Sequence, residues 1–212
     1  MLKLQPRSWQ AVPRLVALEA SIHASETLLE REIVERWELL LYSLALEFMT
    51  GRPAGFVLPP GSKPSSPRVV GVSVRLDAQN DPDATYSFLE KLVHVLLPSQ
   101  MGFEGVTPPM PANHDPWPGR KAEPDHRVAP LRPFATELKL TNLLAFPDLE
   151  RHFSRFEALR GMRVRLEMEG VAAEDCAALL SGLSVPLLTG PAADAALAEA
   201  AEQAERRRRG QA

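Results

Sequence analysis

Arginine, lysine and serine residues gather in a stretch of the chain that contains no acid, and this composition suits the binding of phosphate groups. No Asp or Glu occurs between Arg52 and Arg75. Each cation that meets a phosphate releases condensed counterions, so the stretch predicts salt-dependent binding to nucleic acid. A solvated Pro/Ser loop has the same composition, and this interpretation stays open. The candidate contact residues here are Arg52, Lys63, Ser65, Ser66, Arg68 and Arg75.

A second group of basic residues lies in a segment dominated by proline, residues 107–133. Proline fixes its own backbone and donates no hydrogen bond, so we expect an extended loop rather than a regular helix or a central strand. An exposed Trp117 in such a loop can stack on an RNA base. The cations available to phosphates are Arg120, Lys121, Arg127 and Arg132.

The same loop carries two histidines and two aspartates, His114, Asp115, Asp125 and His126. Their spacing matches no metal-binding template and no cysteine supports them, so we expect neither a metal nor a cofactor. A hydrolase that uses His114, Asp125 and His126 is one alternative, although no nucleophile elbow or phosphate loop accompanies them. We therefore expect a protein that is not an enzyme.

Composition limits the possible functions. A chain of 212 residues with 45% hydrophobic content can bury a core, and one domain with extensions is the natural expectation. The net charge of −3 gives no overall attraction to nucleic acid, so RNA contacts must come from local clusters. The single Cys176 cannot form an internal disulfide, and its apolar neighbours predict a buried packing residue.

The N-terminal residues are basic. Lys3, Arg7 and Arg14 precede the first acid, Glu19, which is typical either of the remnant of an organelle presequence or of a basic extension that lies on a partner. No stretch is long and apolar enough to cross a bilayer, and no signal-peptide core follows Met1, so we expect no membrane partner.

The first half of the chain predicts two strand and helix pairs. Residues 12–22 favour a strand, and Thr27-x-x-Glu30 has the spacing of a capping box at the start of a long helix that Gly51 ends. The alternating residues 69–76 favour a second strand, and a helix of about four turns fits between Asp81 and Pro98. The expected apolar face of the long helix comprises Leu29, Ile33, Trp37, Leu40, Leu41, Leu44 and Phe48.

The second half predicts two strands and a final helix. Residues 137–146 alternate, and residues 162–168 alternate with Val164 and Leu166 inward and Arg163 and Arg165 outward. An acidic pair then leads a helix with Cys176, Leu179, Leu180 and Leu183 on one face. Beyond residue 188 an alanine-rich helix is expected, and its terminal cations complement the helix dipole. They are Arg206, Arg207, Arg208 and Arg209. The elements together predict an α+β fold in which an antiparallel sheet packs against helices.

Short motifs occur in the order of a known family. The chain resembles the large-subunit ribosomal protein family number five, the universal binder of 5S rRNA in the central protuberance, over residues 12–188. The motifs are individually short, and their order carries the resemblance. They are Pro13-Arg14, Thr50-Gly51-Arg52-Pro53, Val72, Val74, Arg75 and Leu76, Tyr86, Phe88, Leu89 and Leu92, Leu97-Pro98, Phe103 and Gly105, Phe146-Pro147-Asp148-Leu149, and Arg160-Gly161-Met162.

The resemblance implies a structural constituent of the large ribosomal subunit that binds 5S-like or other central-protuberance rRNA. It implies further partners: neighbouring central-protuberance proteins, a small-subunit head protein across an intersubunit bridge, and P-site tRNA. The family's basic loop is shortened here to residues 58–67, and Ser21 and His23 stand where the family has Asn and Gly. Such a remodelled RNA interface is typical of a mitochondrial ribosomal protein in the matrix.

Three regions follow from this interpretation: an N-terminal extension (1–11), an rRNA-binding domain (12–188) and a helical tail (189–212). Besides the two basic groups above, the expected RNA contacts are Arg14, Ser21, His23, Arg163, Arg165 and the terminal arginines. An organellar scaffold or RNA-binding protein that keeps the fold outside the ribosome is the alternative.

Overall fold

The computed structural model describes residues 12–23, 36–58, 69–100, 102–111, 131–159 and 161–191, with 193, 195, 197 and 198. The structure combines helices with antiparallel strand pairs, which confirms the α+β class. The elements are β1 (Arg14–His23), α1 (Arg36–Thr50), β2 (Gly55–Val57), β3 (Gly71–Asp77), α2 (Pro82–Lys91), the π-helix η3 (Leu92–Leu96), α3 (Leu97–Ser99), β4 (Met110–Pro111), β5 (Arg132–Leu140), α4 (Pro147–Glu150), α5 (Phe153–Phe156), β6 (Met162–Gly170) and α6 (Ala173–Gly182).

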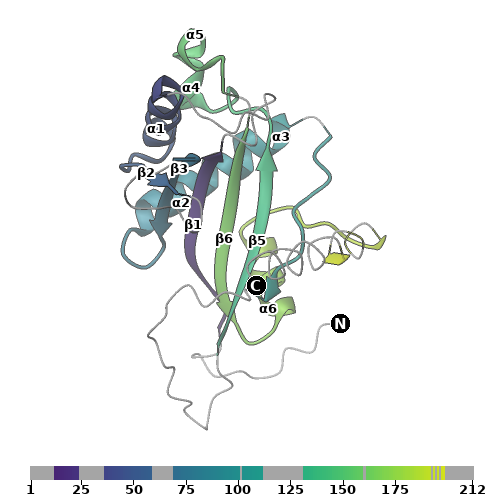
Figure 1. Cartoon of the computed structure of the whole chain (residues 1–212). Helices are drawn as coiled ribbons and strands as arrows, with labels where there is room; N and C mark the ends of the chain where they lie inside the picture. The colour runs from purple at the N-terminus through teal and green to yellow at the C-terminus, as the bar shows by residue number, and fades with distance from the viewer. Residues whose placement is uncertain are drawn as a thin grey trace, which may run out of the picture. The chain divides into compact units, whose positions relative to one another are not determined.

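One six-stranded sheet runs in the order β2-β3-β1-β6-β5-β4 (Figure 1). β1 pairs antiparallel with β3, from Ala17 opposite Asp77 to His23 opposite Gly71. β2 pairs antiparallel with β3, and β4 with β5. The antiparallel sheet packed on helices that the sequence predicts is therefore present.

The chain divides into two compact units. The first unit comprises residues 1–15, 104–136 and 167–212, and the second comprises residues 16–103 and 137–166. The predicted regional boundaries at residues 11 and 188 stay predictions. In the part of the chain that the structure describes, no helix has the length and apolar character needed to span a membrane.

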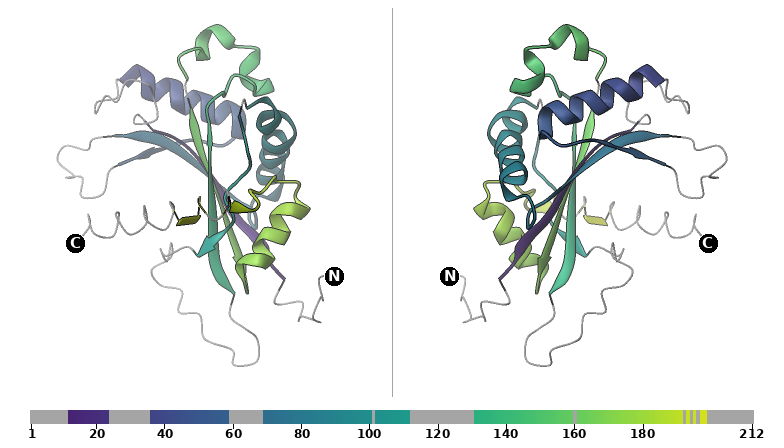
Figure 2. Two further views of the ribbon diagram at one scale, coloured as in Figure 1. Left: turned by 90° about the vertical axis from the view of Figure 1, so that its right-hand side faces the viewer. Right: turned by 90° about the vertical axis from the view of Figure 1, so that its left-hand side faces the viewer.

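The core of the second unit lies on one face of the sheet. Val72, Val74 and Leu76 of β3 are buried, and Ser73, Arg75 and Asp77 alternate with them. Helices α1 and α2 pack against β3, and Figure 2 shows α2 on one side of the strands. The Phe88 ring of α2 stacks on Phe146 with 5.7 Å between ring centroids.

Helix α1 turns a different face to the core than the sequence predicts. Tyr42, Ala45, Leu46 and Met49 are buried, and this set also has i, i+3, i+4, i+7 spacing. The predicted face is wrong as a core face, since its described large residues are mostly exposed: Trp37 (55%), Leu40 (71%), Leu44 (39%) and Phe48 (44%). Two apolar stripes therefore lie on one helix. Of the remaining predicted residues, Leu29 and Ile33 lie outside the described residues, as does the Thr27 capping box.

The end of α1 agrees with the prediction. Gly51 adopts a φ of 68°, a left-handed conformation that glycine enters without steric cost. Its N–H donates to the Glu47 carbonyl at 2.8 Å. The helix therefore ends at the predicted glycine.

The expected helix between Asp81 and Pro98 is present, but it contains a π-helical turn that the sequence does not signal. α2, η3 and α3 follow one another without a break from Pro82 to Ser99. Asp81 occupies the N-cap position and makes no side-chain capping bond. Pro98 lies inside the last turn, and the backbone becomes extended at Gln100. The proline ends the helix close to where its missing N–H predicts.

Strand β5 begins five residues earlier than predicted and ends six earlier, spanning residues 132–140 in place of 137–146. Leu138 and Leu140 are buried as expected, and Leu143 and Phe146 are buried from a turn. The Gln100 side chain ends the strand: its Oε1 accepts from the N–H groups of Thr141 and Asn142, both at 3.0 Å. Its Nε2 donates to the Asn142 carbonyl at 2.8 Å. One amide therefore redirects the backbone after Leu140.

In the first unit a short parallel bridge joins residues distant in sequence. The Val106 N–H donates to the Pro186 carbonyl at 2.8 Å, and the Leu188 N–H donates to the Val106 carbonyl at 2.9 Å. Gly105 has a φ of 134°, and a Cβ there would lie 2.9 Å from the Leu188 nitrogen. Only glycine fits this close approach.

The last helix and the last strand agree with their predictions. Cys176 and Leu180 of α6 are buried, and the Ala172 N–H donates to the Asp175 carboxylate at 3.2 Å. β6 buries Val164 and Leu166, as the alternation predicts. The end of the predicted tail, residues 199–212, lies outside the described residues.

Candidate nucleic-acid interface

The sheet of the second unit has a face that helix α2 does not cover. In Figure 1, α2 lies behind β1 and β6, so the viewer looks at this face. On β3 it carries Ser73, Arg75 and Asp77, which alternate with the buried valines and leucine. The register places Ser21 opposite Ser73 and Glu19 opposite Arg75. Residues directly opposite in an antiparallel pair share a face, so these side chains are neighbours.

β5 and β6 supply further charged residues by the same alternation. Arg163 and Arg165 alternate with the buried Met162, Val164 and Leu166. The Arg165 Nη1 lies 3.9 Å from Glu137 Oε1, so the two strands present these side chains together. We call the set formed by Glu19, Ser21, His23, Ser73, Arg75, Asp77, Glu137, Lys139, Arg163 and Arg165 the open face.

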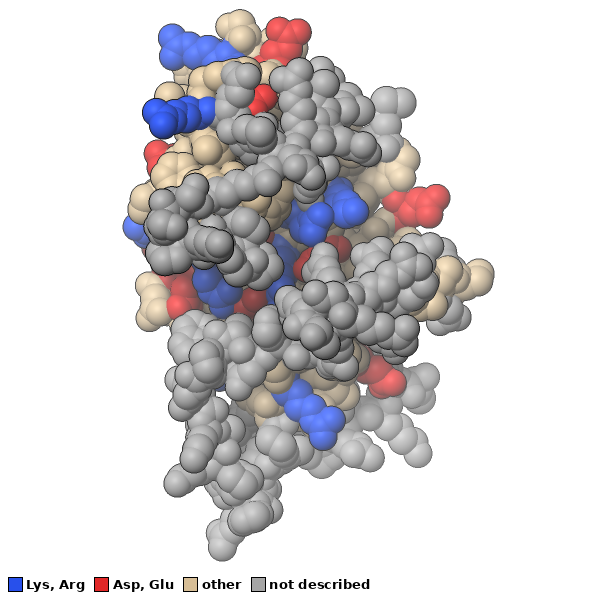
Figure 3. All heavy atoms as spheres, viewed as in Figure 1, with Lys and Arg blue, Asp and Glu red and all other residues tan. Residues whose placement is uncertain are grey.

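The charge on the open face is mixed. Its acids Glu19, Asp77 and Glu137 lie among the basic residues Arg75, Lys139, Arg163 and Arg165. Figure 3 shows blue and red side chains close together in the middle of the view. Such a surface attracts phosphates less than a purely basic one.

Small residues lie opposite one another on part of the open face. Gly55 of β2 lies opposite Ser73, and Ser73 lies opposite Ser21. Gly71 lies opposite His23, and a Cβ on Gly71 would lie 2.5 Å from the Ile22 carbonyl oxygen. The Ser21 side chain is buried (8% exposed), so its hydroxyl offers less to a partner than the sequence suggests.

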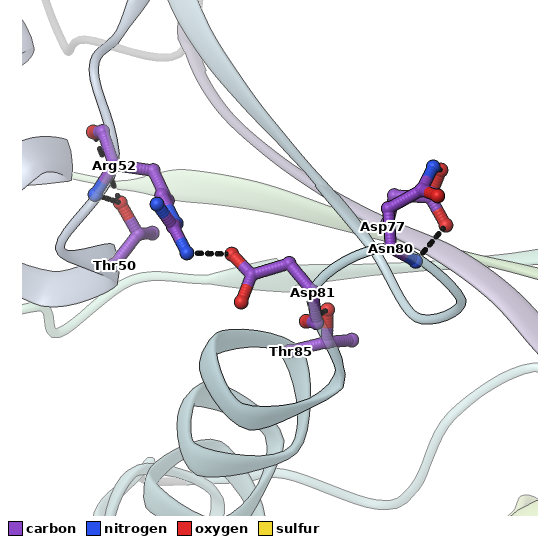
Figure 4. Close-up of polar contacts among 6 residues, drawn as sticks. All are labelled: Thr50, Arg52, Asp77, Asn80, Asp81 and Thr85. Atoms are coloured by element: carbon purple, nitrogen blue, oxygen red, sulfur yellow. Dashed lines mark hydrogen bonds and ion pairs between the residues drawn. The ribbon is translucent and has the colours of Figure 1, made fainter.

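Asp77 fixes the turn that follows β3. Its carboxylate accepts from the Gln79 N–H at 2.8 Å and from the Asn80 N–H at 3.3 Å. It also accepts from the side-chain amide of Asn80 at 2.5 Å (Figure 4). These bonds lower the pKa of Asp77, with the Gln79 N–H first among the causes. The negative charge of Asp77, at this end of the open face, therefore serves to hold the turn after β3.

Arg52 lies at the exit of α1 and forms an ion pair with Asp81 at the start of α2 (Figure 4). Thr50 supports this exit, since its hydroxyl donates to the Leu46 carbonyl at 2.7 Å and accepts from the Arg52 N–H at 3.3 Å. The Arg52 side chain is 51% exposed, so the pair is a surface one of small energy. A phosphate would have to compete with Asp81 for this guanidinium.

Arg14 belongs to the first unit and also has an acidic partner. Its Nη2 and Nε donate to Glu169 Oε2 at 2.6 Å and 2.9 Å. Arg132, at the start of β5 in the same unit, is exposed. Neither residue belongs to the open face of the second unit.

The open face brings together Ser21, His23, Arg75, Arg163 and Arg165 from the predicted RNA contacts. The structure adds Ser73, Lys139, Glu19, Asp77 and Glu137, which are not among the contacts predicted from the sequence. The alternation of residues 137–140 pointed to Glu137 and Lys139 alike, whereas the register of β1 against β3 reveals that Glu19 lies beside Arg75. The other predicted contacts lie outside the described residues: Lys63, Ser65, Ser66, Arg68, Arg120, Lys121, Arg127, Arg206, Arg207, Arg208 and Arg209.

The histidines and aspartates of the proline-rich loop, His114, Asp115, Asp125 and His126, also lie outside the described residues, as does Trp117. Within the described ranges, no group of His, Cys, Asp or Glu is placed to hold a metal ion. Cys176 is buried, and this burial raises the pKa of its thiol to about 11. A thiol with so high a pKa is a poor nucleophile, in line with the packing role predicted for it.

Comparison with known proteins adds a similarity over most of the chain. No family model matches the chain. The chain is 26% identical over 158 residues to the large ribosomal subunit protein uL5m of Reclinomonas americana, which covers 72% of this chain and 74% of that protein. The similarity supports a divergent relationship to this family of ribosomal proteins.

Proposed function

We propose that the chain is a structural, non-catalytic protein of the large ribosomal subunit in mitochondria, and that it binds rRNA through the open face. The observation that carries the proposal is the 158-residue similarity to uL5m, since it extends over most of both chains. The order of family motifs along residues 12–188 supports it from the sequence alone.

The chemistry of the open face supports RNA as the ligand. Arg75 and Arg163 offer planar guanidinium groups to phosphates, and Ser73 and His23 offer hydrogen bonds to ribose hydroxyls. The neighbouring acids limit the electrostatic part of binding, so shape complementarity supplies a large share.

The resemblance supplies finer parts of the proposal. The RNA is a 5S-like or other central-protuberance rRNA, and the protein neighbours are central-protuberance proteins and a small-subunit head protein across a bridge. The arginines at 206–209 dock on rRNA. The shortened loop at residues 58–67 leaves the P-site tRNA as the least supported partner.

A scaffold or RNA-binding protein outside the ribosome is the second candidate. The observation that favours it is the presence of Glu19, Asp77 and Glu137 on the open face, together with the net charge of −3. Such a protein would not associate with large subunits.

Binding of the purified chain to transcribed large-subunit rRNA tests the role of the open face. We expect the double variant Arg75→Gln/Arg163→Gln to bind roughly tenfold or more weakly, since a hydrogen bond between a charged group and a phosphate contributes about 1.5–3 kcal/mol. The slope of log K against log salt should fall by about 0.7–0.9 for each phosphate that the variant no longer neutralises. Arg151→Gln, an exposed residue at the end of α4, is the control. Equal affinities for all three chains would contradict RNA binding through this face.

A further inference from the structure

A groove lies between α1 and the segment 154–158, both in the second unit. It has a volume of about 560 Å³. Its α1 side is formed by Trp37, Leu40, Leu41 and Leu44, the apolar stripe that α1 turns away from the core. Its other wall is formed by Ser154, Arg155, Glu157 and Ala158. Contiguous exposed apolar surface of this kind marks an interaction site.

The wall is held firmly against α1. The Phe48 ring contacts His152 and Phe156 in edge geometry, with 5.5 Å and 6.0 Å between ring centroids. Phe156 is itself buried, so it anchors the segment in the core. Phe48 and Phe156 therefore fix the position of this wall against α1.

The α1 side of the groove has helical spacing. Trp37, Leu40, Leu41 and Leu44 lie at i, i+3, i+4 and i+7 over two turns of α1, about 10 Å. Ser154 and Ala158 are small residues four positions apart, so another backbone can come close to this wall. An amphipathic helix that lays its apolar face into a groove uses anchors at i, i+3, i+4 and i+7, and two turns of such a helix can lie along this one.

The charges on the groove wall indicate which residue type the edge of an incoming helix should carry. Arg155 lines the wall, and among the described residues it has no acidic partner within ion-pair distance. An acid on the incoming helix that reaches Arg155 would complete the pair. Glu157 in the same wall and Glu47 on α1 are both exposed, which disfavours an RNA phosphate backbone at this place.

We propose that this groove binds an amphipathic helix of another protein, with apolar residues at i, i+3 or i+4, and i+7 and an acidic residue facing Arg155. A second copy of this chain fits less well, because its own 154–158 segment already flanks the α1 stripe that it would have to insert. Helix binding here does not require RNA binding, since no residue of the groove belongs to the open face.

Site-specific photocrosslinking tests the proposal. A benzophenone amino acid replaces Leu40, which is 71% exposed, in the full chain expressed in the source cells. The control chain carries it at Glu90, which is exposed on α2. We expect Leu40 to crosslink to a protein peptide with the stated apolar spacing and an acid at its edge. Crosslinking to RNA, to a second copy, to a peptide without that pattern, or to nothing would overturn the proposal.

Charge reversal then tests the role of Arg155. We expect Arg155→Glu to reduce the Leu40 crosslink about tenfold, and exchange of the mapped partner acid to Arg to restore it. Arg151→Glu makes the same charge change outside the groove lining and should leave the crosslink unchanged. Equal loss in both variants would contradict a specific pair at Arg155. If the chain stays out of large subunits while the Leu40 crosslink persists, the ribosomal function fails and the groove proposal stands.

Discussion

Cys176 and Gly170 meet at one of the tightest contacts of the first unit. A Cβ on Gly170 would lie 2.6 Å from the Cys176 sulfur, and its other neighbours would be at 3.5 Å or more. We therefore expect Gly170→Ala to lower the free energy of unfolding by about 1–3 kcal/mol through overpacking. The same substitution in a Cys176→Ala background should cost much less. Urea unfolding of the four chains measures this, and an equal cost in both backgrounds would show that the backbone is the cause.

The raised pKa of Cys176 also predicts a pH dependence. The thiol has an ordinary pKa of 9.0, and burial raises it to about 11 in the folded chain. Its contribution to stability is therefore complete below pH 9 and is lost as the pH rises toward 11. The stability difference between wild type and Cys176→Ala should be constant from pH 6 to about 8.5 and should then shift against wild type. Tyr42 is present in both chains, so its titration does not alter the difference in stability between them. Parallel losses of stability in the two chains above pH 9 would contradict the assignment.

The role of a residue was predictable from the sequence where it depends only on residues close to it in the chain. The lone Cys176 among apolar residues and Gly51 after a helical pattern behave as predicted. The partner of Asp81 was not predictable in this way: it occupies the N-cap position of α2 without a capping bond, and its carboxylate pairs with Arg52 from the end of another helix. Partners that distant in sequence are set by the tertiary fold.

At the scale of elements, α1 carries two apolar stripes and only one faces the core. Leu46 is fully buried and Leu40 is 71% exposed. We expect Leu46→Ala to lower the free energy of unfolding by about 2–5 kcal/mol, as large-to-small substitutions in cores do. Leu40→Ala should change stability by no more than about 0.5 kcal/mol. Thermal or urea unfolding measures the stability of both variants. A greater loss of stability for Leu40→Ala than for Leu46→Ala would show that α1 turns the Leu40 stripe to the core.

Periodicity alone could not choose between these stripes, because both have helical spacing. The choice depends on which stripe fits β3, where the small Ala45 and the long Leu46 and Met49 are buried together. The end of β5 could not be predicted from the sequence either. The Gln100 amide that redirects residues 141 and 142 lies 41 residues before Thr141 in the chain. The alternation of β3 and β6 did predict those strands, because one face of each is polar.

At the scale of the whole molecule, the net charge of −3 and the mixed open face set the expected mode of RNA binding. Few phosphate contacts mean a modest dependence on salt, with affinity carried by shape and hydroxyl contacts. The fold class was predictable from the order of elements. The position of Glu19 beside Arg75 was not, because β1 and β3 are separated by 47 residues and their register decides which side chains meet.

Sedimentation of a mitochondrial lysate on a magnesium-containing sucrose gradient tests the central claim most directly. Fractions are probed for the chain at low salt, at high salt and after magnesium removal. We predict migration with the large ribosomal subunit at low salt, and release only by high salt or by loss of magnesium. A chain that stays at the top of the gradient under the gentlest conditions would contradict the ribosomal role and would favour the scaffold outside the ribosome.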